Sequence, residues 1–189
     1  MSKEMTGIRP ATLEDAKDIL AIYEPYILNT TITYEYDKIP LEDFKLRMES
    51  IMRKHPYLVY EVEGEIAGYV YASPHFERAG FAWDCEVAVY LSPKFHGQGI
   101  ASKLYKVLFE IVEKQGYKNI YSMLDYPNEA SFALHKKFGF TEVAIYKNTA
   151  YKFGAWRHLQ VLEKRFGDLS EPKKINDDWR SIQIEGLDC

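Results

Sequence analysis

The sequence predicts an α+β fold in which a mixed β-sheet is flanked by helices. Two observations support this prediction. The 189 residues, 47% of them hydrophobic, suit a single domain with a sizeable core. Strand-like and helix-like segments also follow one another in the irregular order β, α, α, β, β, β, α, β, α, β, β, which lacks the strict alternation of a doubly wound sheet.

The first third of the chain is expected to hold one short strand and two helices. Residues 7–11 form the strand, and Thr12 is a good N-cap for the helix that follows. Pro25 is expected to bend or end the first part of this helix. The β-branched, polar segment 29–35 reads as loop or extended chain, and Pro40 opens the second helix.

The remaining elements are marked by glycines and by hydrophobic periodicity. Gly64 separates the two strands of a hairpin, Gly116 ends a helix, and Gly139 closes another that Asn128 caps. The expected ranges are strands 57–63, 65–73 and 81–91, helix 100–114, strand 119–124, helix 128–138, and strands 140–147 and 150–164.

The chain changes character near residue 166. Residues 1–166 are expected to form the domain, and 167–189 a polar C-terminal extension. This extension is either a mobile tail or an arm that docks on the body. Docking is favoured because the segment contains four large apolar residues, namely Trp179, Ile182, Ile184 and Leu187.

Composition narrows the classes of function. A net charge of −4 without a basic stripe disfavours a nucleic-acid binder. The two cysteines, Cys85 and Cys189, suggest neither a disulfide framework nor a metal site, and the five histidines lack ligand spacing. The N-terminus has no signal-peptide pattern, and no segment has the length of a membrane span. A cytoplasmic protein is therefore expected, with no metal and no membrane or nucleic-acid partner.

The stretch 83–108 carries the strongest functional signal. A strand containing Glu86 leads into a turn with Gly97 and Gly99, and a helix starts at Ile100. Free backbone N–H groups and the positive end of the helix dipole make such a helix start suitable for an anion. The turn matches neither GxxxxGK[ST] nor GxGxxG, so ATP and NAD are not indicated. A glycine pair alone is also compatible with a purely structural turn.

Two segments together resemble the GNAT acetyltransferases. The sequence from His96 to Ala101 is similar to the family's Gln/Arg-x-x-Gly-x-Gly/Ala turn, with His96 in place of Gln or Arg. Downstream, Asn128 at a helix start and Gly139-Phe140 after its end resemble the second signature. The phosphinothricin N-acetyltransferase-like branch is the closer match, over roughly residues 6 to 165. Further similarities to that branch are Ile8-Arg9-Pro10-Ala11-Thr12, Trp83 with Glu86, and Lys152-Phe153-Gly154-Ala155-Trp156.

The resemblance implies an acetyl-CoA cleft between splayed strands of a mostly antiparallel sheet. It implies that backbone N–H groups of Val89, Tyr90 and Leu91 stabilise the thioester oxygen, and that the turn holds the pyrophosphate. The implied cofactor-binding residues there are Gly97, Gln98, Gly99, Ile100, Ala101 and Ser102, together with Asn128 downstream. A homodimer is also implied.

Two side chains are candidates for the chemistry. Glu86 lies among apolar neighbours, and desolvation would raise its pKa toward the range of a general base. Spacing alone favours the alternative, a Glu on a solvated strand face, but the resemblance reverses this preference. Asp84 lies on the same strand face and is a weaker candidate for the base than Glu86. His135 lies two helical turns from Asn128 on the same face, and the sequence leaves open whether it acts as acid or base.

The resemblance implies an amino-acid-like acceptor amine, of the phosphinothricin or methionine sulfone and sulfoximine type. Arg78 could bind its carboxylate, although a surface Arg is equally compatible. Thr31, Tyr34 and Trp83 are the other expected acceptor residues. Two alternatives remain open: an enzyme that acetylates proteins or polyamines, and a non-catalytic acetyl-CoA sensor.

Overall fold

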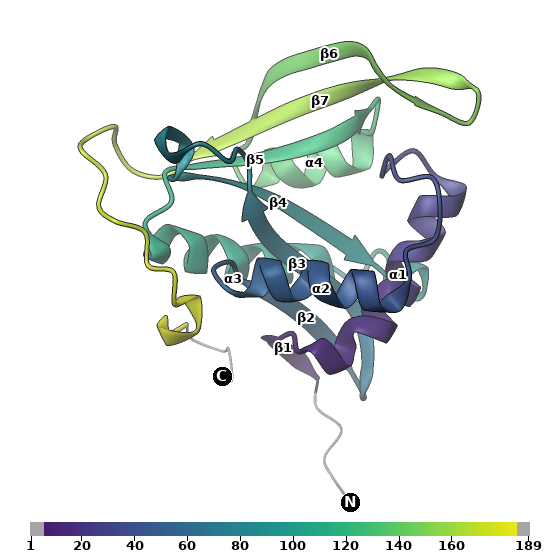
Figure 1. The fold of residues 1–189 in the computed structure, drawn as a ribbon, viewed down its shortest axis with the longest axis horizontal. Helices are drawn as coiled ribbons and strands as arrows, with labels where there is room; N and C mark the ends of the chain where they lie inside the picture. Colours follow the sequence, from purple (N-terminus) through teal and green to yellow (C-terminus); the bar gives the residue numbers. More distant parts are fainter. Residues whose placement is uncertain (1–5, 185–189) are drawn as a thin grey trace, which may run out of the picture.

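The computed structural model describes residues 6–184, which contain one seven-stranded sheet with the strand order β1-β2-β3-β4-β5-β7-β6 (Figure 1). The strands are β1 (Gly7–Pro10), β2 (Tyr57–Val62), β3 (Glu65–Pro74), β4 (Asp84–Leu91), β5 (Asn119–Tyr126), β6 (Thr141–Lys152) and β7 (Ala155–Arg165). All neighbouring pairs are antiparallel except β4 and β5. The predicted mixed, mostly antiparallel sheet is confirmed.

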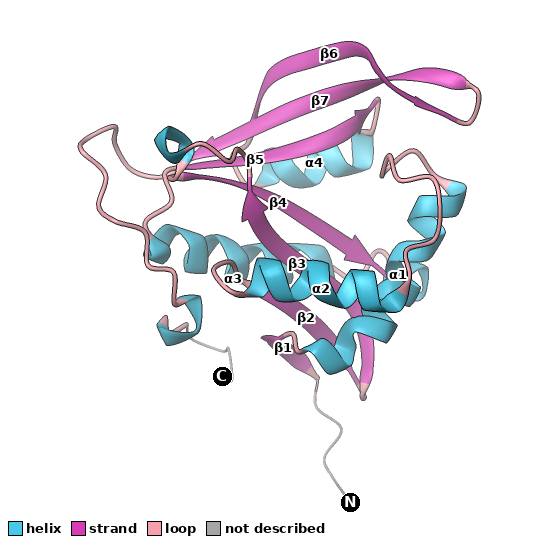
Figure 2. Ribbon diagram, in the orientation of Figure 1, coloured by secondary structure: helices cyan, strands magenta, loops and turns pink. Residues whose placement is uncertain are grey.

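Helices cover both faces of the sheet (Figure 2). They are α1 (Ala16–Asn29), α2 (Leu41–Met52), α3 (Ile100–Gln115) and α4 (Glu129–Lys137). Helices α1 and α2 pack with Tyr57, Val59 and Tyr69 in one buried cluster. Helices α3 and α4 share a second cluster with Leu58 and Val70 on the other face. Alternate residues of β2 and β3 thus face different helix layers, as the pleat of a strand requires.

The parallel contact between β4 and β5 is short. Only Asp84–Glu86 pairs with Asn119–Tyr121, whereas β4 stays paired with β3 from Cys85 to Leu91. Beyond Glu86 the two parallel strands separate, so one edge of β4 is left without a β5 partner. The splay that the resemblance implied is present, and it positions the candidate site.

Two expected boundaries were wrong. Pro25, which was expected to bend or end the helix, does not end α1. Pro25 has no N–H to donate to the carbonyl of Ala21. Both residues lie on the exposed side of the helix, so this carbonyl can bond to water instead. Strand β4 starts at Asp84 instead of residue 81, because Ala79–Phe81 forms a 3-10 turn. The last hairpin turns at Phe153-Gly154, both with positive φ, in the two-residue turn that strand twist favours.

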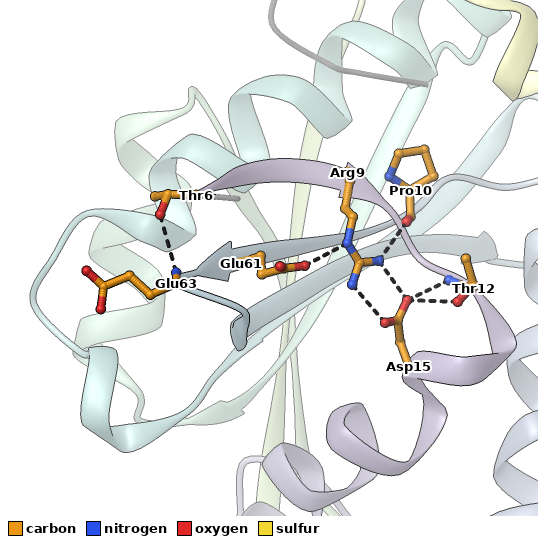
Figure 3. A network of polar contacts seen from close by, with 7 residues as sticks. All are labelled: Thr6, Arg9, Pro10, Thr12, Asp15, Glu61 and Glu63. Carbon is orange, nitrogen blue, oxygen red and sulfur yellow. Dashed lines mark hydrogen bonds and ion pairs between the residues drawn. The ribbon is translucent and has the colours of Figure 1, made fainter. Parts of the chain in front are cut away.

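Arg9 fixes the start of the chain to the rest of the domain (Figure 3). Its guanidinium donates to Glu61 Oε2 on β2 and to both carboxylate oxygens of Asp15, each at 2.8 Å. Asp15 also accepts from the backbone N–H of Thr12, the predicted N-cap, and the two residues form a capping box. Burial alone would raise the pKa of Asp15, but the hydrogen bonds from Arg9 and Thr12 outweigh it and lower that pKa.

The C-terminal extension docks on the domain as far as the structure describes it. Trp179 is 1% exposed and its indole N–H donates to the carbonyl of Met52 at 3.1 Å. Ile184 is also buried. The amide of Gln115 at the end of α3 donates to the carbonyl of Asn176 at 2.8 Å. The expected docking is confirmed for Trp179 and Ile184, and Leu187 lies outside the described residues. Within residues 6–184, no helix has both the length and the apolar character needed to cross a membrane.

His55 makes the stability of this fold pH-dependent. Its Nε2 lies 2.9 Å from the hydroxyl of Tyr117, and burial lowers its pKa to about 4. In the unfolded chain the pKa of His55 is about 6.5. Between pH 4 and pH 6.5, His55 is therefore protonated in the unfolded state but not in the folded state. The free energy of unfolding is therefore expected to fall by about 3 kcal/mol as the pH drops from 6.5 to 4.

Urea denaturation of the protein and of His55→Gln, at a series of pH values from 7 to 4, measures this contribution. The variant should be less stable at pH 7 and lose less stability on acidification. If the free energy of unfolding changed equally with pH in the two proteins, His55 would not be the source of the pH dependence.

Candidate active site

A cavity occupies the splay between β4 and β5. It brings together several residues that the sequence singled out, namely Glu86, Val89, Tyr90, Asn128 and His135. It also contains residues that the sequence did not point to: Ile32, Tyr71, Val87, Ala88, Tyr105, Ser122, Met123, Leu124, Asp125 and Ser131. The cavity is therefore built from β3, β4, β5, α3 and α4, with the segment after α1 as a further wall.

The backbone of β4 presents alternate N–H groups to this cavity. The N–H of Ser92 donates to the carbonyl of Ala67 at 2.9 Å, on the β3 side. Because N–H directions alternate along a regular antiparallel ladder, the N–H of Tyr90 also faces β3, whereas those of Val89 and Leu91 face the opening. The expectation that Tyr90 offers a backbone donor there was wrong. Its side chain, instead, lines the cavity.

The turn before α3 leaves space for an anion. Gly97 and Gly99 have φ of +77° and +74°, and a Cβ added at either position would find no atom within 4 Å. Gly99 is the N-cap of α3 and has no side chain to pair with the first N–H groups of the helix. The residues from Gln98 to Ser102 therefore fit the pyrophosphate of coenzyme A, because unpaired N–H groups and open space coincide.

His96 has a definite place in this structure. Its Nε2 lies 3.3 Å from the carbonyl oxygen of Leu91 and 3.2 Å from the hydroxyl of Tyr26. The hydroxyl of Tyr26 itself donates to the same carbonyl at 2.6 Å. His96 thus ties the turn to the end of β4, and the unusual residue at this position is accounted for by packing against α1.

Glu86 projects into the cavity from the middle of β4. Its side chain is 34% exposed, and its Oε2 lies 3.4 Å from Nδ1 of His75. Burial raises the pKa of Glu86, and His75 partly opposes this rise. A carboxylate with a raised pKa is a better proton acceptor than an ordinary surface glutamate.

His135 is a buried part of the cavity wall. Its Nδ1 lies 2.7 Å from the carbonyl of Ser131, which can only accept, so this nitrogen carries the proton. Nε2 then accepts from the hydroxyl of Tyr105 at 2.9 Å. Burial lowers the pKa of His135 and raises that of Tyr105, so both stay neutral near pH 7. Tyr105 was missed because a tyrosine inside an amphipathic helix reads as core.

A clamp of polar contacts holds the segment after α1 against the cavity. Thr31 Oγ1 and the Tyr34 hydroxyl both donate to the carboxylate of Asp125, the latter at 2.8 Å. The ammonium of Lys152 donates to the carbonyl of Thr33 at 2.6 Å. Thr31 and Tyr34 thus help to close the site. Asp125 and Lys152 were missed because their partners lie about 90 and 120 positions away in the sequence.

None of the four expected acceptor residues lines the cavity itself, although Thr31 and Tyr34 bond to Asp125, which does. Arg78 is exposed in the segment between β3 and β4 and does not line it. Trp83 is turned away, because its indole N–H donates to the carbonyl of Lys173 in the C-terminal extension at 2.7 Å. Trp156, in the segment 152–156 that resembles the family, is 62% exposed on β7 against Tyr151. The structure does not bring Arg78 and Trp83 to this cavity, and their role in binding the acceptor stays a prediction.

Comparison with known proteins identifies the family. Residues 8–161 match the model of the acetyltransferase (GNAT) domain. The chain is 30% identical over 168 residues to the phosphinothricin N-acetyltransferase of Streptomyces viridochromogenes, covering 89% of this chain and 92% of that protein. It is 28% identical to the L-methionine sulfoximine/L-methionine sulfone acetyltransferase of Pseudomonas aeruginosa, covering 83% and 92% of the two chains.

A solved structure agrees with these matches. The phosphinothricin acetyltransferase of Sinorhizobium meliloti, determined with acetyl-CoA, superimposes with a TM-score of 0.85 at 28% identity, covering 89% of this chain and 93% of that one. The open cavity, the glycine turn and the free edge of β4 are the features that such a cosubstrate requires. The protein therefore belongs to the GNAT family of acetyltransferases and uses acetyl-CoA as its acetyl donor.

Proposed function

We propose that the protein acetylates the amine of a small amino-acid-like acceptor, of the phosphinothricin or methionine sulfone and sulfoximine type. The observation that carries the proposal is that Glu86 and Val89 line one cavity, on the part of β4 whose outward N–H groups have no β5 partner. The named activities of the relatives support the acceptor class.

In the proposed reaction, Glu86 takes a proton from the acceptor ammonium, either directly or through one water molecule. The nitrogen lone pair then forms a bond to the thioester carbonyl carbon, and the carbon–sulfur bond breaks, so that coenzyme A leaves as a thiolate. The nitrogen gives up its second proton, which converts the thiolate to the free thiol. The N–H groups of Val89 and Leu91 stabilise the carbonyl oxygen as negative charge develops on it. The turn at Gly97–Gly99 and the first turn of α3 bind the pyrophosphate, and Asn128 completes the site at the start of α4.

His135 is assigned to the proton-accepting side of the reaction. Its single proton is engaged with the carbonyl of Ser131, so it has none to give to the leaving sulfur. Its Nε2 accepts from Tyr105, and a proton that arrives at the Tyr105 oxygen can pass on to this nitrogen. The second carboxylate near the splay, Asp84, is bonded by the amide of Asn119 at 2.7 Å, which supports Glu86 as the base.

We also propose a cytoplasmic homodimer. The hairpin of β6 and β7 carries a set of exposed aromatic side chains at the free edge of the sheet, and burial against a second copy would remove them from water. These are Tyr146, Tyr151, Phe153 and Trp156, which are 48–62% exposed. The free thiol of the buried Cys85 supports a reducing compartment.

An amine panel tests the proposed acceptor. The protein is incubated with acetyl-CoA and phosphinothricin, methionine sulfone, methionine sulfoximine, spermidine or a lysine peptide, and release of free thiol is followed. The amino-acid-like acceptors should show the highest kcat/KM. Faster turnover of spermidine or the peptide would favour the alternative enzyme class. Acetyl-CoA binding without amine-dependent thiol release would favour a sensor.

A further inference from the structure

One histidine faces the proposed base and has no role in the scheme above. His75 follows the last residue of β3, Pro74, and its Nδ1 lies 3.4 Å from Oε2 of Glu86. Its side chain is only 4% exposed, although it belongs to a segment whose next residues are exposed. The register of β3 against β4, in which Ser73 pairs with Glu86, places the ring beside this carboxylate.

Aromatic contacts hold the imidazole in this position. The ring of Tyr121 lies nearly parallel to it, at 4.2 Å between centroids and 14° between planes. Tyr121 pairs with Glu86 across β4 and β5, and its hydroxyl donates to Glu163 at 2.9 Å. The ring of Phe76 packs at 4.1 Å. A stacked, buried ring loses little freedom when it pairs with a carboxylate, unlike a histidine on an open surface.

The surroundings of Glu86 offer few other groups to stabilise its negative charge. Titratable side chains near it are Tyr71 from β3, Asp84 and Cys85 from β4, Tyr121 from β5 and, behind Tyr121, Glu163 from β7. All of these are neutral or negative near pH 7. Within residues 6–184, His75 is the only residue that forms a hydrogen bond or ion pair with the Glu86 carboxylate.

We propose that His75 is a positioning residue for the reaction: its Nδ1–H donates to Glu86, aims the carboxylate at the acceptor amine and stabilises its ionised form. The inference rests on the proposed role of Glu86 as base. Burial raises the pKa of Glu86 and the contact with His75 lowers it, so the histidine opposes the effect of desolvation on this carboxylate.

Two substitutions separate the N–H group from the ring. His75→Phe keeps an aromatic ring against Tyr121 but removes the donor, whereas His75→Asn keeps an amide N–H near the position of Nδ1. In His75→Phe the acid limb of the kcat/KM profile should move up by about one pH unit, because Glu86 then protonates more readily. The kcat at pH 7 should fall several-fold with little change in the Kd of acetyl-CoA. His75→Asn should restore most of the activity and of the pH profile.

His158→Phe is the matched control. His158 also lies near a tyrosine ring, Tyr126, and accepts a hydrogen bond from the backbone N–H of Asn148, but it lies on another part of the sheet. The acid limb of the kcat/KM profile should not move in His158→Phe. An unmoved limb in His75→Phe, with loss of activity only, would reduce His75 to a structural role and overturn the proposal.

A titration that needs no acceptor keeps this test apart from the proposed function. The Glu86 carboxylate is followed by ¹³C NMR in the free protein and in His75→Phe and His75→Asn. A higher pKa in the Phe variant than in the Asn variant supports the pairing, even if no amine of the panel reacts. Equal values in all three proteins contradict it. Failure of the proposed function would appear separately, as acetyl-CoA binding without amine-dependent thiol release in the panel, whereas unchanged turnover in Glu86→Gln would refute only the role of Glu86 as base.

Discussion

Glu86→Gln is expected to lower kcat for the best amine by about 10²- to 10⁴-fold at neutral pH, the usual contribution of a general base. Glutamine keeps the shape of the side chain but cannot take the proton from the ammonium. The Kd of acetyl-CoA should stay nearly unchanged, because the cosubstrate is held by the β4 backbone and by the turn. Steady-state thiol release and equilibrium binding of acetyl-CoA measure the two quantities separately.

The pH profile adds an independent check. Burial raises the pKa of Glu86, and a base works only when deprotonated, so kcat/KM should fall as the pH drops through a value above the ordinary glutamate range. Asp84→Asn is the matched control, since Asp84 lies two residues earlier on the same strand and is held by Asn119. Its turnover should stay within a few-fold of the original. Unchanged turnover in Glu86→Gln would remove Glu86 as the base.

Gly99→Val is expected to weaken acetyl-CoA binding by roughly 100-fold, the effect of losing about two charge-assisted hydrogen bonds. The backbone at residue 99 has φ of +74°, which a β-branched residue adopts only at a cost. The added side chain would occupy the open space in front of the α3 N-terminus, where the pyrophosphate is proposed to bind. Isothermal titration with acetyl-CoA measures the change.

Gly154→Val separates backbone strain from loss of the site. Gly154 has the same φ of +74° and equally open space around its Cβ, but it lies in the turn between β6 and β7. This variant should lose similar stability and keep its affinity for acetyl-CoA. If both variants bind acetyl-CoA equally well, the turn at Gly99 does not hold the pyrophosphate.

The parts of the site that the sequence determined by itself are local ones. The turn at Gly97 and Gly99 and the Asn128 cap, whose Oδ1 accepts from the N–H of Ser131 at 3.1 Å, depend on neighbouring residues only. The apolar neighbours of Glu86 in β4 are local as well, but spacing alone favoured a solvated Glu, and the family resemblance was needed to make Glu86 the candidate base. Glycine spacing, capping residues and strand alternation therefore sufficed for the strand, the turn and the helix.

The tertiary structure decided what these local pieces face. The register of β4 against β3 decides whether the N–H of Val89 or that of Tyr90 faces the cavity. Local sequence patterns do not specify this register. The orientation of Trp83 depends on a hydrogen bond from its indole N–H to the carbonyl of Lys173, which lies 90 positions away. The clamp on Asp125 and the contact of His75 with Glu86 likewise join segments that meet only after the sheet has formed. Such pairs are set by strand pairing and by the packing of helices on the two faces.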